Sequence, residues 1–208
     1  MKLYHIPGSC SLSPHIVIRE LDLPVELVRV DHRRHTTEHG ADFLAINPLG
    51  YAPVLELANG TRLSEGPAIV QFLADQRPAS GLAPDPGSFA RYQLQQWLNF
   101  ISTEIHKGFI PLLYAVAAGQ YVDTVRPKLM KRFEHVDRVL AGTPYLLGHT
   151  FSVADAYLFA LTRWGKAAWM TSEYNADIDV SGLSHLRDWF ARVHGRPAVQ
   201  AALAADRR

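Results

Sequence analysis

The 208-residue sequence contains a single cysteine, Cys10, and no long apolar run. One cysteine excludes an internal disulfide, and a free thiol survives best in a reducing compartment. No stretch reaches the roughly 20 apolar residues that a membrane-spanning helix needs, and the first residues lack the apolar segment of a secretory signal. We therefore expect a cytoplasmic protein with no membrane role.

An excess of charge of one sign is also absent. The chain has 21 Lys and Arg residues against 20 Asp and Glu residues, which gives a formal net charge of +1 at pH 7. Proteins that bind nucleic acid need a concentrated positive surface. Since neither half of the chain is strongly basic, we expect no nucleic-acid partner.

The first eighty residues mix strand and helix patterns. Alternating and β-branched residues predict strands at 2–5, 25–30, 52–57 and 61–63. Helical patterns follow Cys10 and Gly66, and the turn pair Asn59-Gly60 joins two of the strands. The order is β-α-β, a loop with a helical turn, then β-β-α, which predicts an α/β domain over residues 1–80.

A stretch with three prolines and two glycines, residues 77–87, follows this domain, and we place the linker at 81–87. Strand signals then largely vanish. Helical patterns cover 89–115, 122–140, 152–168 and 183–205. The first pattern is expected to bend at Pro111, and the last to break at Arg196-Pro197. The predicted fold class is therefore α/β plus all-α, with the helical domain over 88–208.

Cys10 lies between a predicted strand and a predicted helix, in the run Pro7-Gly8-Ser9-Cys10-Ser11-Leu12-Ser13-Pro14. The free N–H groups at a helix start favour a thiolate. Lowering a thiol pKa of ~8.5 by two units takes about 2.7 kcal/mol, whereas a helix end supplies about 0.3–2 kcal/mol. A reactive thiol would therefore need a further donor or cation. The alternative is a small buried apolar side chain.

Two further segments carry chemical signals. Pro53 opens a strand, where a cis Ala52-Pro53 bond would turn the Ala52 N–H and C=O outward to pair with an extended peptide; a plain loop-to-strand proline is the alternative. In Ser64-Glu65-Gly66-Pro67, the N–H groups of a helix start can hold a carboxylate and Glu65 can bind an ammonium. The alternative role of Glu65 is to complement the helix dipole.

Together these segments resemble the glutathione transferase superfamily, most closely its bacterial beta class. The resemblance covers essentially the whole chain and rests on residues 2–15, 43–50, 63–71 and 96–107. It implies a thioredoxin-like first domain, a helical second domain and a homodimer. It also implies an enzyme with glutathione as co-substrate and no permanently bound cofactor.

The implied reaction conjugates glutathione to small hydrophobic electrophiles. A second chemistry on the same fold is thiol–disulfide exchange or peroxide reduction through Cys10, whose second thiol must come from a partner. A non-catalytic binding or regulatory protein on the same scaffold is the alternative, although such relatives tend to lose the residues that hold glutathione.

The resemblance implies roles for individual residues. Cys10 faces the glutathione sulfur and can form a mixed disulfide with it, and Ala52 pairs with the backbone of the tripeptide's cysteine. Glu65 and Gly66 hold the γ-glutamyl ammonium and carboxylate, and Gly66 stands where other classes usually carry serine. The implied glutathione-binding set comprises Cys10, His35, Ala52, Pro53, Glu65, Gly66, Asn99, Thr103, Glu104, Ile105, His106 and Lys107.

His35 departs from the family pattern, because related beta-class enzymes have a lysine there that reaches the glycine carboxylate of glutathione. Histidine is mostly neutral at pH 7 unless its environment favours the charged form. We therefore expect glutathione affinity to weaken between about pH 6 and about pH 8 as His35 loses its proton.

Asn99, Thr103 and His106 are spaced by four and three residues and share one helix face. Apolar residues occupy roughly the opposite face, so periodicity alone predicts that these three side chains are solvated. The resemblance instead places them in the cleft between the domains, with His106 as a second catalytic residue near Cys10. Lys107 would add a positive charge.

Three other features are interpreted as structural. Ser152 and Asp155 form a variant capping box at a helix start, and we assign Asp155 to folding. Trp97 and Trp164 are expected in the core or the cleft wall, with Trp164 assigned to the wall of the electrophile site.

A histidine cluster, His32, His35 and His39, encloses Arg33 and Arg34. Their positive charges would repel a metal cation, and no further ligand set follows. We expect no metal site.

Overall fold

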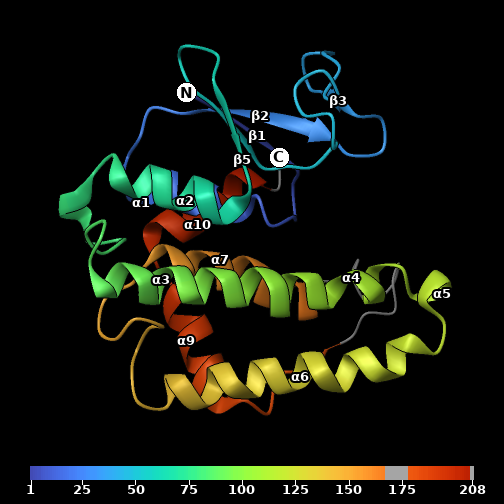
Figure 1. Ribbon diagram of the computed structural model, residues 1–208, viewed down its shortest axis with the longest axis vertical. Helices are drawn as coiled ribbons and strands as arrows, with labels where there is room; N and C mark the ends of the chain where they lie inside the picture. Colours follow the sequence, from blue (N-terminus) through green and yellow to red (C-terminus); the bar gives the residue numbers. More distant parts are fainter. Residues whose placement is uncertain (167–177, 207–208) are drawn as a thin grey trace.

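The computed structural model describes residues 1–166 and 178–206. It has two parts, a small sheet with its helices and a larger array of helices (Figure 1). This is the predicted architecture, a thioredoxin-like domain followed by a helical domain. No helix among the described residues is long and apolar enough to cross a membrane.

The sheet has five strands in the order β3-β2-β1-β4-β5. The strands are β1 (Lys2–His5), β2 (Glu26–Asp31), β3 (Thr36–Thr37), β4 (Val54–Glu56) and β5 (Arg62–Ser64). β1 runs parallel to β2 and antiparallel to β4. Parallel neighbours need a crossover, and α1 (Leu12–Glu20) supplies it. Every strand predicted from the alternation is present, and β3 is an addition.

The loop between β2 and β4 was expected to contain a helical turn. It holds β3 and a hydrogen-bonded turn in which the Asn47 N–H donates to the Phe43 carbonyl at 2.8 Å. Phe43 is buried against Tyr4 of β1, with ring centroids 6.0 Å apart. This loop therefore covers one face of the sheet with an aromatic side chain rather than with a helix.

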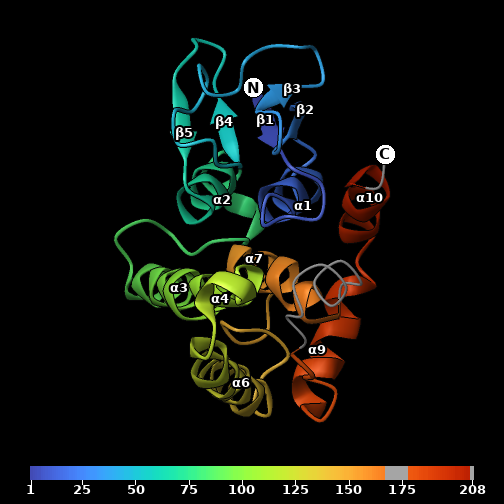
Figure 2. The same ribbon diagram turned by 90° about the vertical axis from the view of Figure 1, so that its right-hand side faces the viewer.

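The opposite face of the sheet is covered by α1 and by α2 (Gly66–Asp75), which lie side by side in Figure 2. Both helices bury apolar side chains against the sheet; Ile16 and Val17 of α1 and Ile69 and Leu73 of α2 are fully buried. The first domain therefore has its larger core between the sheet and the helical domain.

The helical domain follows a short 3₁₀ turn, η1 (Pro78–Ser80). Its elements are α3 (Phe89–Phe100), η2 (Ile101–His106), α4 (Lys107–Leu113), α5 (Ala115–Ala118), α6 (Tyr121–Leu140), α7 (Val153–Thr162), η3 (Arg163–Lys166), α9 (Ser184–His194) and α10 (Pro197–Asp206). The predicted break at Arg196-Pro197 separates α9 from α10. The last residues of the helix predicted over 152–168 lie outside the described residues.

The prediction of one helix over 89–115 is wrong in detail. The backbone changes at Ile101 into the π-helical segment η2, continues as α4, and is interrupted at Tyr114, whose φ and ψ are −117° and 39°. Pro111 lies inside α4. An apolar periodicity does not distinguish a π turn from an α turn over six residues, so η2 could not be predicted from the sequence.

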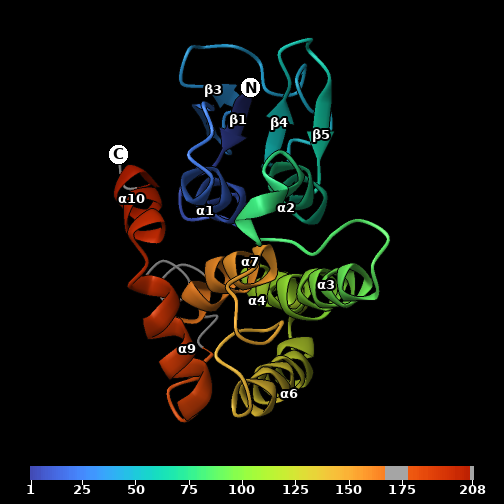
Figure 3. The ribbon, with the colours of Figure 1, turned by 90° about the vertical axis from the view of Figure 1, so that its left-hand side faces the viewer.

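Two ion pairs tie the domains together. Arg91 of α3 is buried and donates to both oxygens of Asp75 in α2, at 2.9 and 2.5 Å. α10 packs against α1 (Figures 2 and 3), where Arg196 donates to both oxygens of Glu20 at 2.6 and 2.9 Å. The last helix of the chain therefore forms part of the wall of the first domain.

The capping box is confirmed. The Ser152 N–H and hydroxyl donate to Asp155 Oδ2 at 3.0 and 2.7 Å, and Asp155 Oδ1 accepts from the Leu146 N–H and from Trp189 Nε1. Asp155 is fully buried. Its carboxylate fixes the start of α7 to a loop and to α9, which agrees with a folding role.

Candidate functional site

Cys10 lies in the turn between β1 and α1. The Ser9 and Ser11 hydroxyls both bond to the Ile6 carbonyl, at 2.7 and 2.9 Å, and Ser11 Oγ accepts from the Ile6 N–H. These serines therefore hold the turn together, and neither caps α1 with its side chain in the usual way. Cys10 is placed immediately before the helix, where the sequence predicted it.

The state of the thiol differs from the expectation. Cys10 Sγ donates to the Ala52 carbonyl at 3.7 Å. Burial raises the pKa of this thiol to about 12; the Glu65 carboxylate raises it further, whereas the Cys10 backbone N–H and Lys107 lower it. The loss of hydration therefore outweighs the helix start, whose backbone N–H lowers the thiol pKa as expected but does not suffice alone.

The segment opposite the thiol has the predicted geometry. The Ala52-Pro53 peptide bond is cis, and the Ala52 carbonyl is the acceptor for Cys10. An extended peptide beside Ala52 would therefore lie next to the sulfur atom.

Glu65 is the residue before α2 and has φ and ψ of 68° and 113°. A positive φ is costly for a residue other than glycine, asparagine or aspartate and persists at functional sites. The Glu65 side chain is exposed and caps no N–H group of α2. At Gly66 an added Cβ would meet no atom within 4 Å. The helix start is thus open, with a carboxylate beside it.

The π-helical segment η2 carries the third part of the site. His106 Nδ1 is hydrogen-bonded to the Tyr157 hydroxyl at 2.7 Å, and its ring lies 5.2 Å from that of Trp164. Burial and the nearby Lys107 lower the pKa of His106 to about 4, so the imidazole is neutral at pH 7. π-helical turns are frequent at functional sites. Among the described residues, the bond that fixes His106 goes to Tyr157 and not to Cys10.

Tyr157 is a candidate site residue that the sequence did not indicate. It lies in the apolar helix α7, where it is indistinguishable from a core residue. Burial raises its pKa, and the Cys10 and Glu65 charges raise it further, while a hydrogen bond with the Ser102 side chain lowers it. Its link to the site is the hydrogen bond with His106.

The other predicted site residues in 99–107 differ in their surroundings: three are exposed, one is ion-paired and one is buried. Asn99, Thr103 and Lys107 are exposed, and the Thr103 hydroxyl donates to the Asn99 carbonyl. Glu104 is ion-paired with Arg132 of α6 at 2.7 Å, and Ile105 is fully buried in the core.

His35 lies apart from the thiol, in the loop before β3. It has a φ of 52°, and its ring packs beside Gly50, where an added Cβ would approach the ring to 3.0 Å. His35 Nδ1 is a buried atom with no hydrogen-bond partner among the described residues.

The two tryptophans have different surroundings. Trp164 is 5% exposed, and its Nε1–H donates to the Gly8 carbonyl at 3.0 Å. Trp97 is partly buried and stacks on His135, with ring centroids 6.0 Å apart. Trp164 is therefore attached to the Cys10 turn, whereas Trp97 packs on α6.

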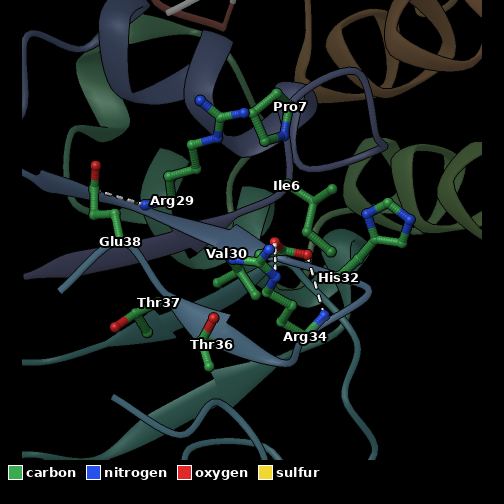
Figure 4. A pocket seen from close by; sticks show the side chains of 10 residues that line it. Ile6, Pro7, Arg29, Val30, His32, Arg34, Thr36, Thr37 and Glu38 are labelled. Carbon is green, nitrogen blue, oxygen red and sulfur yellow. Dashed lines mark hydrogen bonds and ion pairs between the residues drawn. The ribbon is translucent and has the colours of Figure 1, made fainter. Parts of the chain in front are cut away.

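A pocket of about 580 Å³ opens beside β2 and β3 (Figure 4). Its wall includes Ile6, Arg29, His32 and Arg34, but none of the predicted site residues. Asp31 accepts from the backbone N–H groups that follow it and pairs with Arg34 at 3.8 Å. Residues 1–166 and 178–206 contain no group of three or more potential metal ligands.

Comparison with known proteins agrees with this geometry. Residues 8–76 match the family model for the glutathione S-transferase N-terminal domain, and residues 100–197 match that for the C-terminal domain. Glutathione S-transferase GstA of Escherichia coli O157:H7 is 41% identical over 206 residues, 99% of this chain and 98% of the relative. Glutathione S-transferase GST-4.5 of Xanthomonas campestris is 37% identical over 213 residues, 99% and 98% of the two chains.

Solved structures give the same result. A bacterial glutathione S-transferase described as a ternary complex of BphK is 50% identical, with a TM-score of 0.92 and full coverage of both chains. A sphingomonad glutathione S-transferase complexed with glutathione is 40% identical, with a TM-score of 0.91 and coverage of 99% and 98%. A beta-class enzyme of Sphingomonas chungbukensis is 37% identical, with the same TM-score and coverage.

The chain therefore belongs to the glutathione S-transferase family. The relatives and solved structures described above are bacterial glutathione S-transferases, and the expected likeness to the beta class is confirmed.

Proposed function

We propose that Cys10, Ala52, Glu65 and Gly66 form the glutathione site of this transferase, and that the bound thiol attacks small hydrophobic electrophiles. The main support is that three elements meet at one thiol. Cys10 Sγ bonds to Ala52 before β4, and the charge of Glu65 at the start of α2 raises the pKa of the same thiol.

The start of α2 suits the γ-glutamyl group. The exposed N–H groups of a helix start attract a carboxylate, and the Glu65 carboxylate beside them attracts an ammonium. The strained backbone of Glu65 is consistent with a residue held in place for binding. The Ala52 N–H and C=O then pair with the backbone of the glutathione cysteine.

Cys10 acts in this proposal as a hydrogen-bond donor. Its pKa of about 12 keeps the proton on sulfur at neutral pH, and the proton is directed at the Ala52 carbonyl. Bound glutathione would use that carbonyl for its own N–H, which frees the Cys10 S–H to donate to the glutathione sulfur. A donor at that position stabilises the glutathione thiolate, and the positive charge of Lys107 acts in the same direction.

The test compares Cys10→Ser with Cys10→Ala. Serine keeps a donor, so conjugation to an activated chlorobenzene should persist, whereas alanine should reduce kcat by about 10- to 100-fold, the effect expected for a hydrogen bond to a charged group. Full conjugation in Cys10→Ala, with loss of disulfide reduction alone, would instead assign Cys10 to thiol exchange. A crystal structure with glutathione would show whether a Cys10–glutathione disulfide forms.

The remaining predicted residues have narrower roles in this proposal. Asn99 and Thr103 offer exposed polar groups, and Trp164 contributes to the wall of the electrophile site. Because the Glu104 and Ile105 side chains are engaged elsewhere, only their backbone is available to a ligand. His35 would reach the glycine carboxylate of glutathione, and its unpartnered Nδ1 supports a polar ligand there.

We also propose a cytoplasmic homodimer. A lone free thiol suits a reducing compartment. Large aromatic side chains are unusually exposed in the monomer, since Tyr51, Phe89 and Tyr92 are 66, 78 and 59% exposed. Light scattering on the purified protein tests the dimer; a monomer at micromolar concentration would contradict it.

A further inference from the structure

Both backbone polar groups of Gly8 are held by the helical domain. The Gly8 N–H donates to Asp206 Oδ2 at 2.9 Å, across 198 residues of sequence, and its carbonyl accepts from Trp164 Nε1 at 3.0 Å. Gly8 has a φ of 76°, which glycine adopts readily. It lies two residues before Cys10, so these bonds act directly on the turn that carries the thiol.

The position of the Asp206 carboxylate at the end of α10 is not favoured by the helix itself. It is the last residue of α10, and a carboxylate at a helix C-terminus is repelled by the helix dipole. The residue is also only 8% exposed, and burial of a carboxylate is costly unless its bonds compensate. Among the described residues, its carboxylate accepts a hydrogen bond from the Gly8 N–H. The contact with the Cys10 turn is therefore what compensates this unfavourable position.

The other carboxylate oxygen of Asp206, Oδ1, lies near the buried His5, which in turn lies beside His15. His5 Nδ1 of β1 lies 3.9 Å from Asp206 Oδ1, and neither atom has a hydrogen bond among the described residues. The His15 ring of α1 lies 6.1 Å from that of His5, and Arg19 donates to His15 Nε2. Burial lowers the pKa of His5, and Asp206 opposes this effect. His5 is thus neutral at pH 7. The Asp206 carboxylate is therefore held through Oδ2, which accepts from the Gly8 N–H.

The packing of α10 on α1 does not depend on Asp206 alone. Arg196, at the other end of α10, pairs with Glu20 of α1 through two short bonds. This pair can hold α10 on α1 if Asp206 is replaced. The two contacts can therefore be separated by mutation, because one touches the Cys10 turn and the other does not.

We propose that Asp206 is a positioning residue for the thiol site: by fixing the Gly8 peptide it sets the place of Cys10 Sγ relative to the Ala52 carbonyl and the start of α1. Without this bond the Gly8 backbone keeps only the Trp164 contact to the helical domain, and the thiol is less well aligned with its acceptor. The inference deepens the proposed role of Cys10 and rests on it for its effect on turnover. The position of the thiol itself can be tested without turnover.

The test uses the fact that Cys10 is the only cysteine. The pH dependence of its alkylation by iodoacetamide is measured in the wild type, Asp206→Ala, Asp206→Asn and Arg196→Met. Asp206→Ala should move the alkylation profile by about one pH unit or more and lower kcat for conjugation about tenfold. Asp206→Asn keeps an oxygen that accepts from Gly8 and should restore the wild-type profile. Arg196→Met, the matched control, should leave the profile unchanged although it loosens the same helix.

Equal shifts in Asp206→Ala and Arg196→Met would overturn the proposal, because they would mean that general loosening of α10 moves the thiol. A wild-type profile in Asp206→Ala would overturn it too, as would an alanine-like profile in Asp206→Asn. If Asp206→Ala does not fold, Trp164→Phe removes the bond to the other side of the Gly8 peptide and should shift the profile in the same way; an unshifted profile would again overturn the proposal. An inactive wild type would contradict the proposed function while leaving the alkylation result valid.

Discussion

The Tyr157 hydroxyl and His106 Nδ1 are 2.7 Å apart, and their hydrogen bond joins helix α7 to the π-helical segment η2. Since the histidine is neutral, one ring nitrogen carries the proton and the other does not. The bond to Tyr157 holds the ring at one orientation and leaves Nε2 as the nitrogen available to a ligand.

Replacing Tyr157 with Phe should therefore remove the bond that orients the His106 ring while keeping the aromatic ring that fills the core. We expect kcat for conjugation to fall about tenfold, the typical effect of one hydrogen bond to a buried polar group, with little change in KM for glutathione. Thr162→Val is the matched control, since it removes another buried hydroxyl from α7, one that donates to the Leu158 carbonyl of the same helix. Equal kinetic losses in the two variants would argue against a specific role for the Tyr157 bond.

Gly66→Ser should strengthen glutathione binding. An added Cβ at Gly66 meets no atom within 4 Å, and the backbone there does not require glycine. A serine hydroxyl would add a donor for the γ-glutamyl carboxylate, which is worth about 1 kcal/mol, or roughly fivefold in Kd. Isothermal titration measures this, with Gly142→Ser, in a turn at the end of α6, as the control. Unchanged or weaker binding in Gly66→Ser would show that the carboxylate lies elsewhere.

Acid should destabilise the protein through buried histidines. Burial lowers the pKa of His15 from 6.5 to about 4, and the pKa of His106 to about the same value. The unfolded chain therefore binds these protons more tightly, so the stabilisation is complete above pH 6.5 and is lost as the pH falls toward 4. The loss is on the order of 3 kcal/mol for His15, which is fully buried.

Urea unfolding between pH 4 and pH 7 tests this behaviour. His15→Gln keeps an acceptor for Arg19 and should reduce the slope of the unfolding free energy against pH by about one proton. His39→Gln, at an exposed position, should leave the slope unchanged. A wild-type slope in His15→Gln would contradict the assignment.

Asp155→Ala should be strongly destabilising and have little effect on the chemistry of the folded protein. The carboxylate accepts four hydrogen bonds in a fully buried position, and its loss leaves the Leu146 N–H and the Trp189 indole without their acceptor. We expect a loss of about 3–5 kcal/mol in the free energy of unfolding. Asp188→Ala, at an exposed position of α9, is the control. A loss below about 1 kcal/mol would remove the folding role.

Local signals in the sequence predicted much of this molecule. Alternation gave the strands, proline and glycine gave the break before α10 and the linker, and the short capping motif gave the start of α7. The Ala52-Pro53 segment and the helix start at Gly66 were also placed correctly. Each of these features depends on residues that are near one another in the chain, so a local pattern carries it.

The errors arose where distant residues meet. The sequence argument for the thiol pKa weighed the helix start and the need for a further donor or cation, but it could not include the loss of hydration on burial or the effect of Glu65. Tyr157 and Asp206 act on the site across many residues, and neither has a local motif. The π turn of η2 was missed because apolar residues on either side keep a helical spacing.

The packing of α10 on α1 has a consequence for protein synthesis. A chain emerging from the ribosome presents all five strands of the first domain long before the residues of α10 (Figure 1). Until Asp206 has emerged, the flank of α1 stays uncovered and the Gly8 peptide lacks its acceptor. The Gly8 N–H therefore gains this acceptor only after α10 has been synthesised, long after the rest of the thiol turn.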